Sequence, residues 1–229
     1  MVSGRELGLT PVRQAPGRLA AGFLFGFGSL AVAAALAVCF RGRLVNFSYS
    51  RPEFVHLLVG AATAAVVVAI LEEFIFRAAL FGVLRKSMAW PAALVISSAV
   101  YASVHFLQKA PTPSHIGWLS GLQVLPVMFR TSADGLAPVP AFFTLLLAGA
   151  ILALAYQRTG NLFMSMGLHA GWIFWLKSYR FLTRDAPGAE RAIWGSDKLL
   201  DGWLPLAVLA VVLVVMISGL RPKPGAATK

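Results

Sequence analysis

Residues 65–80 read AVVVAILEEFIFRAAL, an apolar stretch that carries two adjacent glutamates and one arginine. It lies inside the longer apolar block Phe54–Leu84, and a helix needs ~20 such residues to cross a bilayer core. Each charge near the centre of a membrane helix costs ~2.5–3.5 kcal/mol on insertion scales. Charges that are retained there face a bundle interior or a water-filled cavity and mark functional sites. We therefore predict a membrane helix with Glu72, Glu73 and Arg77 turned toward the protein interior.

Helix geometry gives the two glutamates different surroundings. At ~100° per residue, Glu73 and Arg77 are one turn and ~40° apart, which is the spacing of an ion pair. Glu72 points ~100° away from Glu73, toward a different neighbour. Arg77 can thus neutralise and orient Glu73, while Glu72 remains a candidate general base. The alternative is a buried polar clamp, in which all three residues only fix helix packing.

The whole chain has the composition of a membrane protein. Of its 229 residues, 58% are hydrophobic and only 13% are charged, against ~25% charged in an average soluble domain. The long second apolar block fits either one tilted helix or a helix followed by a short one, and the short fourth block fits a half-helix. The expected fold class is all-α, a polytopic membrane helix bundle of six to eight transmembrane helices. The seven candidate spans are Leu19–Phe40, Phe54–Leu84, Pro91–Leu107, Ile116–Phe129, Val139–Tyr156, Leu162–Leu176 and Trp203–Leu220.

The chain reads as one domain. We expect a basic N-terminus at 1–18, a single bundle at 19–220 with its functional core at about 54–176, and a basic tail at 221–229. The net charge of +11 comes from basic residues between apolar blocks, as in membrane loops, so no nucleic-acid partner is expected. Seven crossings and a cytoplasmic N-terminus would place slightly more Lys and Arg inside, with Arg43 outside and Arg184 inside. The Ala-, Gly-, Val- and Arg-rich composition is typical of a bacterium with a GC-rich genome, so the expected location is a bacterial inner membrane.

Two histidines lie on polar faces of later apolar blocks. Ser98, Tyr101 and His105 share one helical stripe, and Asn161, Ser165 and His169 share another. A lone membrane histidine is often only an interhelical hydrogen-bonding group. Two such histidines beside a buried pair of glutamates fit a converging site better. Glycines at 167 and 171 bracket His169 at a spacing that lets a neighbouring helix approach closely.

These motifs together resemble those of the CAAX prenyl protease and bacteriocin-processing family, also called the type II CAAX prenyl endopeptidase or Abi group. The matching residues are Glu72-Glu73-x-x-x-Arg77, Tyr101-x-x-x-His105 and His169, within roughly Phe54–Leu176. The family consists of polytopic intramembrane endopeptidases. The resemblance implies that Glu72 and His105 hold and activate the attacking water without a cofactor. It further implies that Glu73 and Arg77 support the site, that His169 stabilises the oxyanion, and that the substrate is a membrane-associated or lipidated peptide or protein.

Two positions depart from the family pattern. Tyr101 stands where the family usually has Phe, and its hydroxyl could join the site. Ile173 stands where the last family motif has Asn or Asp. Loss of one oxyanion donor typically lowers the rate by ~10²–10³. The indole N–H of Trp172 is a candidate replacement, although it lies ~100° around the helix from position 173.

Two other readings remain open from the sequence. A zinc ion on Glu72, His105 and His169 would also activate water, since two imidazoles and a carboxylate suit Zn²⁺. A non-catalytic membrane scaffold, an immunity-type protein or a small transporter would also contain buried acids and histidines. The residues determine neither the identity of the substrate nor the oligomeric state.

Overall fold

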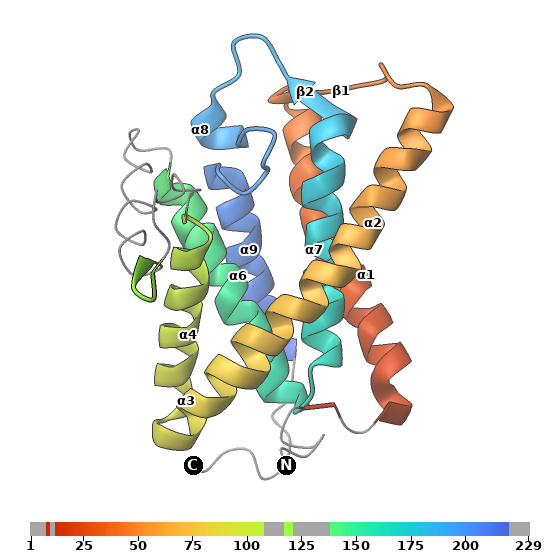
Figure 1. Ribbon diagram of the computed structural model, residues 1–229. Coiled ribbons are helices and arrows are strands. Elements are labelled where there is room, and N and C mark those ends of the chain that lie inside the picture. The colour runs from red at the N-terminus through yellow and green to blue at the C-terminus, as the bar shows by residue number, and fades with distance from the viewer. Residues whose placement is uncertain (1–7, 10–11, 108–116, 121–137, 220–229) are drawn as a thin grey trace.

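The structure is a computed structural model, and it describes residues 8–9, 12–107, 117–120 and 138–219. The described chain is almost entirely helical, and Figure 1 shows its helices gathered side by side in one bundle. This confirms the predicted all-α membrane bundle. Its elements are η1 (Val12–Gln14), α1 (Ala15–Cys39), β1 (Arg43–Val45), α2 (Arg51–Glu73), η2 (Phe74–Phe81), α3 (Gly82–Ser87), α4 (Trp90–Val104), α6 (Pro138–Thr159), α7 (Phe163–Leu182), β2 (Thr183–Asp185), α8 (Arg191–Trp194) and α9 (Trp203–Gly219).

Within the described residues, three helices are long and apolar enough to cross a membrane by length and composition. They are α1, α6 and the continuous helix Arg51–Ser87, which comprises α2, η2 and α3. Its 37 residues span roughly 55 Å at ~1.5 Å each, more than a ~30 Å bilayer core. The long second block is therefore one helix, and Figure 1 shows it running diagonally across the bundle. The predicted span Ile116–Phe129 lies mostly outside the described residues, as do the tail 221–229 and most of the N-terminal ten residues.

Helix α7 is the central helix of the bundle and packs against α1 and α2. It buries polar residues such as Ser165 and His169 on faces that other helices cover. This explains why it is less apolar than the lipid-facing helices. Its last residue, Leu182, lies six positions beyond the end that the apolar pattern predicts.

Glycines allow α1 and α7 to pack backbone against backbone. A Cβ added at Gly26 would lie 2.2 Å from the carbonyl oxygen of Leu168, and one added at Gly167 would lie 2.2 Å from that of Leu19. Both distances are far below van der Waals contact, so only glycine fits at these positions. The expected close approach beside His169 is thus confirmed. Its counterpart on α1, Gly22-x-x-x-Gly26, carries the same small-residue spacing in the sequence.

A short antiparallel pair of strands joins the α1–α2 connection to the end of α7. In it, Arg43 lies opposite Asp185 and Leu44 opposite Arg184. The buried Arg43 side chain pairs with Asp185 and donates to the Thr183 hydroxyl. Arg43 and Arg184 therefore lie at the same end of the bundle, so the seven-crossing arrangement that separates them is wrong.

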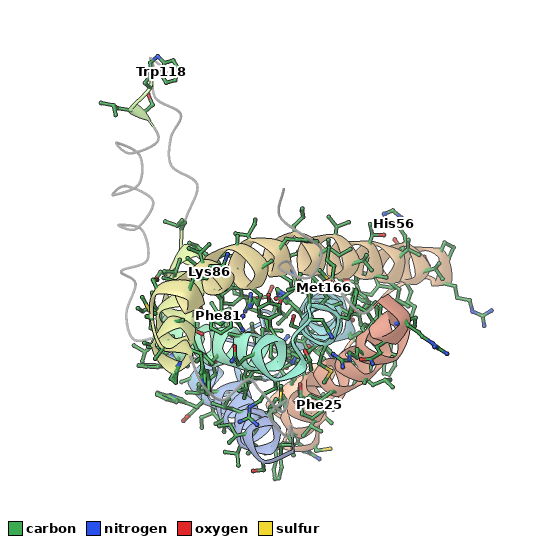
Figure 2. The ribbon with its side chains drawn as sticks, turned by 90° about the horizontal axis from the view of Figure 1, so that it is seen from below. Phe25, His56, Phe81, Lys86, Trp118 and Met166 are labelled. Carbon is green, nitrogen blue, oxygen red and sulfur yellow. The ribbon has the colours of Figure 1, made fainter. Side chains whose placement is uncertain are left out.

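The end-on view separates interior from lipid-facing residues. In Figure 2, Phe81 and Met166 lie between helices, and both belong to one buried apolar cluster. His56 lies on the outer face of α2 and is exposed, consistent with a lipid headgroup contact rather than a site. The other peripheral histidine of the sequence, His115, is outside the described residues.

Candidate active site

The glutamate pair occupies the last turn of α2, directly before a π-helical segment. Glu73 is fully buried, and its Oε1 lies 3.1 Å from Nη1 of Arg77. The Arg77 guanidinium also donates to the carbonyl of Gly149 on α6 and lies 4.6 Å from the ring centroid of Tyr101. The expected ion pair between Glu73 and Arg77 is present, so the Glu73 charge is balanced by its own helix. The wider winding of η2 was not apparent from the sequence, and such segments are frequent at functional sites.

His169 connects the fully buried Glu73 to the partly buried Glu72. Its Nδ1 lies 3.0 Å from Oε1 of Glu73. Because an ionised carboxylate only accepts hydrogen bonds, this contact assigns a proton to Nδ1 and directs Nε2 toward the cavity. There Nε2 lies 3.3 Å from the Tyr101 hydroxyl and 3.6 Å from Oε2 of Glu72. Glu73 therefore sets the orientation and tautomer of the imidazole.

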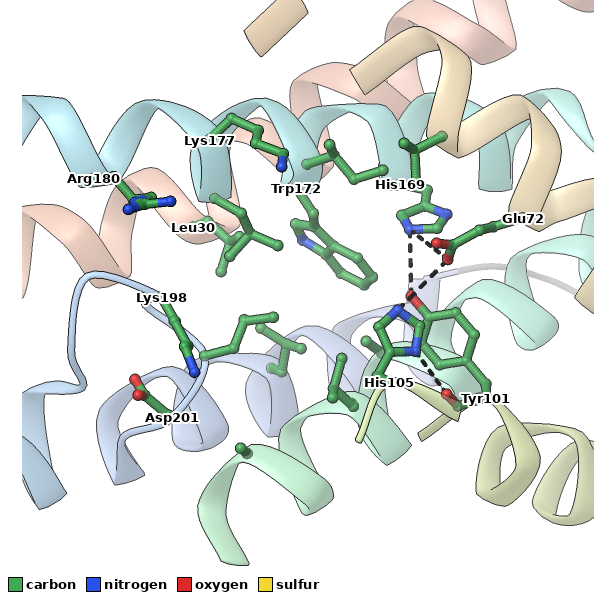
Figure 3. Close-up of a pocket in the computed structure, with 18 of the residues that line it drawn as sticks. Leu30, Glu72, Tyr101, His105, His169, Trp172, Lys177, Arg180, Lys198 and Asp201 are labelled. Atoms are coloured by element: carbon green, nitrogen blue, oxygen red, sulfur yellow. Dashed lines mark hydrogen bonds and ion pairs between the residues drawn. The ribbon is translucent and has the colours of Figure 1, made fainter. Parts of the chain in front are cut away.

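Glu72 lies between the two histidines, as Figure 3 shows. Its Oε2 is 3.7 Å from Nε2 of His105, whose Nδ1 donates to the carbonyl of Tyr101 at 2.7 Å. Both Glu72–imidazole distances exceed a direct hydrogen bond and are short enough for one bridging water molecule. The side chain of Glu72 is 24% exposed, whereas that of Glu73 is 0%. Of the two acids, Glu72 is the one that solvent and a substrate can reach.

These side chains line one end of a cavity of about 820 Å³. Helix α2 contributes Glu72, the C-terminal end of α4 contributes Tyr101 and His105, and α7 contributes His169. The middle of the cavity is apolar, with Leu30 and Trp172 among its walls, and its far end is charged (Figure 3). A volume of this size accommodates a short peptide segment. The structure thus brings Glu72, His105 and His169 to one surface, with Glu73 and Arg77 directly behind them.

The position that departs from the family motif also lines this cavity. Ile173 lies one turn beyond His169 and supplies an apolar surface where an amide would supply a donor. The Trp172 indole does not replace it, because its N–H donates to the Ser29 hydroxyl at 2.9 Å. The hydroxyl of Tyr101 is a polar group beside His169 that the usual phenylalanine would lack.

Among the described residues, no group of three His, Cys, Asp or Glu side chains is arranged to hold a metal ion. The zinc reading therefore stays a prediction of the sequence, and a chelation experiment decides it.

Sequence reasoning missed the charged end of the cavity. The polar composition of residues 178–202 is typical of a surface loop, and it does not reveal that part of this segment returns to the cavity wall. A signal was present, since Lys177 and Arg180 follow His169 by eight and eleven positions and so share its helix face. The charged lining residues are Lys177, Arg180, Asp197, Lys198 and Asp201.

Comparison with known proteins adds one match. The model of the type II CAAX prenyl endopeptidase Rce1-like family matches residues 54–175, just over half of the chain. This segment runs from α2 to α7 and includes every residue of the glutamate–histidine cluster. No curated protein and no solved structure matches the chain. The resemblance seen in the motifs is confirmed: this integral membrane protein belongs to the type II CAAX prenyl endopeptidase Rce1-like family.

Proposed function

We propose that the protein is an intramembrane endopeptidase that hydrolyses a peptide bond of a membrane-associated or lipidated substrate. The observation that carries the proposal is the convergence of Glu72, His105 and His169, from three helices, on one wall of a peptide-sized cavity. Membership of the family supports a peptidase, and the geometry supports an activated water as its nucleophile.

In the proposed reaction, Glu72 and His105 hold a water molecule between Oε2 and Nε2. Glu72 removes a proton as the water oxygen bonds to the substrate carbonyl carbon. The tetrahedral intermediate then collapses, the C–N bond breaks, and the proton passes from Glu72 to the leaving amine. Hydrolysis thus consumes one water and returns Glu72 to its carboxylate form.

The oxyanion of the intermediate needs hydrogen-bond donors within ~3 Å. We propose that Tyr101 supplies one, because its hydroxyl lies on the cavity wall next to His169. His169 supplies the other from Nε2 in its doubly protonated form, while the Glu73 carboxylate at Nδ1 holds the ring in position. The pair would perform the role that the Asn or Asp at position 173 has elsewhere in the family.

A proteolysis assay tests the function. The probe is a fluorescent peptide with a farnesylated cysteine near its free C-terminus, and products are identified by mass spectrometry. Loss of a general base typically costs ~10²–10⁴ in rate, so Glu72→Gln and His105→Ala should lose cleavage to that extent. The control His56→Ala alters an exposed histidine on the same helix as Glu72 and should cleave normally. Equal processing by all four proteins would refute the proposal.

The same assay separates the water mechanism from zinc. Incubation with a chelator should leave the rate unchanged, and metal analysis of the purified protein should give less than stoichiometric zinc. Loss of activity with the chelator and its recovery on adding Zn²⁺ would establish the zinc version instead.

One observation favours a non-catalytic scaffold as the second candidate. Ile173 places an apolar side chain on the cavity wall one turn from His169. A scaffold would bind the peptide probe and leave it intact in both the natural chain and Glu72→Gln.

A further inference from the structure

The β1–β2 pair lies where the polypeptide leaves the hydrocarbon layer. Helix α1 has 25 residues and extends ~37 Å at ~1.5 Å per residue, against ~30 Å for a bilayer core, so its ends reach the headgroup layers. At the C-terminal end of α1, residues 40–51 meet residues 183–194 through the strand pair and through the stacked rings of Phe40 and Trp194. Figure 1 shows the two segments across one end of the bundle. We call them together the ribbon surface.

The ribbon surface presents an apolar ring on a fixed backbone. Phe47 is 89% exposed. The residue before it, Asn46, donates from its backbone N–H to the carbonyl of Leu182 at 2.8 Å and from its side-chain amide to that of Phe181 at 3.2 Å. The residue after it, Ser48, donates from its backbone N–H and its hydroxyl to the Asn46 amide oxygen at 3.2 and 2.7 Å. Hydrogen bonds on both sides therefore fix the backbone that carries the exposed ring, which is the arrangement of an apolar anchor at a membrane surface. The other exposed apolar side chains of the ribbon surface are Phe40, Val45, Tyr49 and Ile193.

The same surface carries three arginines without a partner. It contains five arginines and two acids, which sum to +3. One acid, Asp185, is shared by two of the arginines, Arg43 and Arg191. Among the acids of this surface, only Glu190 then remains. The other three arginines are exposed and make no ion pair or hydrogen bond to any part of the chain that the structure describes; they are Arg41, Arg51 and Arg184. Anionic headgroups supply the counter-charges that the protein lacks here.

The backbone at Arg41 is strained. This residue follows the last turn of α1 with φ at +56°, in the left-handed region where helices usually end on glycine. There the Cβ of an L-residue crowds the following carbonyl oxygen, so arginine costs stability that glycine would not. Strain of this kind persists where the side chain has a function. Arg41 directly follows the exposed ring of Phe40, as expected of a cation that meets headgroup phosphates at the edge of the apolar layer.

We propose that the ribbon surface binds anionic phospholipids, with Phe47 among the upper acyl chains and Arg41, Arg51 and Arg184 on the headgroup phosphates. The inference is independent of the proposed peptidase function. An arginine near an anionic membrane surface contributes about a fivefold gain in binding, so one to three of them on a lipid give about a 5- to 100-fold preference. Because the ribbon surface joins the ends of α1, α2 and α7, bound lipid should also stabilise these helices together.

Native mass spectrometry of the purified full-length protein in a neutral detergent tests the charge preference. It measures the affinity for added phosphatidylglycerol and for phosphatidylcholine with the same acyl chains. The natural protein should bind phosphatidylglycerol more tightly by about 5- to 100-fold. The Arg41→Gln, Arg51→Gln, Arg184→Gln triple variant should bind the two lipids alike. The corresponding variant with lysine at all three positions should keep the preference, because it keeps the charge.

The matched control neutralises two exposed cations at the opposite end of the bundle. They are Arg13, before α1, and Lys86, on α3, and the Arg13→Gln, Lys86→Gln variant should keep the preference. Equal affinity of the natural protein for the two lipids would overturn the proposal. An equal loss of preference per charge removed in the control and in the triple variant would do so too, because it would reflect net charge alone.

The strained backbone gives a separate test through stability. In nanodiscs of phosphatidylcholine, Arg41→Gly should unfold at a higher temperature than the natural protein, because it removes the strain. Adding phosphatidylglycerol should raise the unfolding temperature of the natural protein more than that of the variant. Arg41→Ala keeps the strain and loses the charge, so it should be less stable than Arg41→Gly and should share its weaker response. The same rise in all three proteins would show that Arg41 does not contact the headgroups, against the proposal.

A spin label at position 47 tests the depth of the surface. In nanodiscs, a nitroxide on the Cys39→Ala, Phe47→Cys protein should be accessible to oxygen in the bilayer and shielded from an aqueous nickel complex. Glu190, the remaining acid, should point to water, so a label on the Cys39→Ala, Glu190→Cys protein should be open to the nickel complex. Free access of nickel to position 47 would place the surface in water and overturn the proposal. Spin–spin broadening between two labelled copies would assign the surface to a second copy of the chain instead.

Discussion

Glu72 and Glu73 are neighbours in the chain and differ in almost everything that surrounds them. Glu73 is enclosed, with Arg77 at 3.1 Å and His169 at 3.0 Å, while Glu72 faces the cavity. Removing the Glu73 charge leaves Arg77 buried without its partner, which costs about 3–5 kcal/mol. Glu73→Gln should therefore lower the thermal unfolding temperature in lipid nanodiscs, whereas Glu72→Gln should lose activity with little change in stability. Similar unfolding temperatures for the two variants would contradict these separate roles.

Tyr101 and Ile173 both depart from the family pattern, and we predict that the Tyr101 hydroxyl replaces the hydrogen-bond donor that Ile173 lacks. If Tyr101 supplies the donor that Ile173 lacks, Tyr101→Phe should lower kcat by ~10²–10³ and leave the fold intact. Ile173→Asn should restore a donor at the position that faces the cavity one turn beyond His169. In that background, Tyr101→Phe should cost much less, so the two effects should be strongly non-additive in kcat. Additive effects in this double-mutant cycle would show that the hydroxyl is not the replacement.

At the residue scale, the sequence was informative where helical spacing alone decides a contact. The ion pair between Glu73 and Arg77 results from their separation of four positions, and it forms within one helix. The contact of Glu73 with His169 joins residues 96 positions apart, and it depends on how α2 crosses α7. Spacing within a helix cannot supply that crossing, so the tautomer and orientation of His169 emerged only from the structure.

At the scale of elements, the glycine contact between α1 and α7 positions the site. Gly26→Ala would place a methyl group 2.2 Å from the Leu168 carbonyl oxygen, which forces the helices apart next to His169. We expect lower thermal stability and reduced cleavage. Gly28→Ala is the matched control on the same helix, because nothing lies within 4 Å of its Cβ position. Equal behaviour of the two variants in unfolding and cleavage assays would show that the close contact is dispensable.

The π-helical segment η2 shows what helix periodicity cannot predict. Its eight residues, Phe74–Phe81, have the apolar composition of the α-helix before them, and only the hydrogen-bond pattern differs. Wider winding changes the direction of every later side chain. It turns Phe81 into the buried cluster with Tyr156 on α6. The Glu73–Arg77 ion pair still forms across the start of this segment, but a constant angle of 100° per residue does not describe the whole of η2.

At the scale of the whole molecule, apolar blocks predicted the bundle because a bilayer requires long apolar helices. The apolar blocks did not show at which end of the bundle each connection lies. The pairing of β1 with β2 places the α1–α2 connection and the end of α7 together. Counting one additional crossing between them places every later connection at the opposite end, and this is why Arg43 and Arg184 were expected on opposite sides.

When each connection is assigned to the bundle end that the β1–β2 pairing gives it, the described Lys and Arg residues near helix ends are distributed unequally between the two ends. Eight lie toward the β1–β2 end and five toward the other. The eight are Arg41, Arg43, Arg51, Lys177, Arg180, Arg184, Arg191 and Lys198, and the five are Arg13, Arg18, Arg85, Lys86 and Arg158. Cytoplasmic connections carry the excess of basic residues. On this count of the described residues we propose a cytoplasmic β1–β2 end, opposite to the orientation expected from the sequence.

The single cysteine of the chain tests this orientation directly. Cys39 is exposed at the end of α1, next to the β1–β2 end. With that end cytoplasmic, a membrane-impermeant maleimide should label Cys39 only after the cells are permeabilised. A Cys39→Ala, Ser87→Cys variant moves the thiol to the exposed last residue of α3, at the opposite end of the long α2–α3 helix, and should be labelled in intact cells. The reverse pattern would restore the cytoplasmic N-terminus.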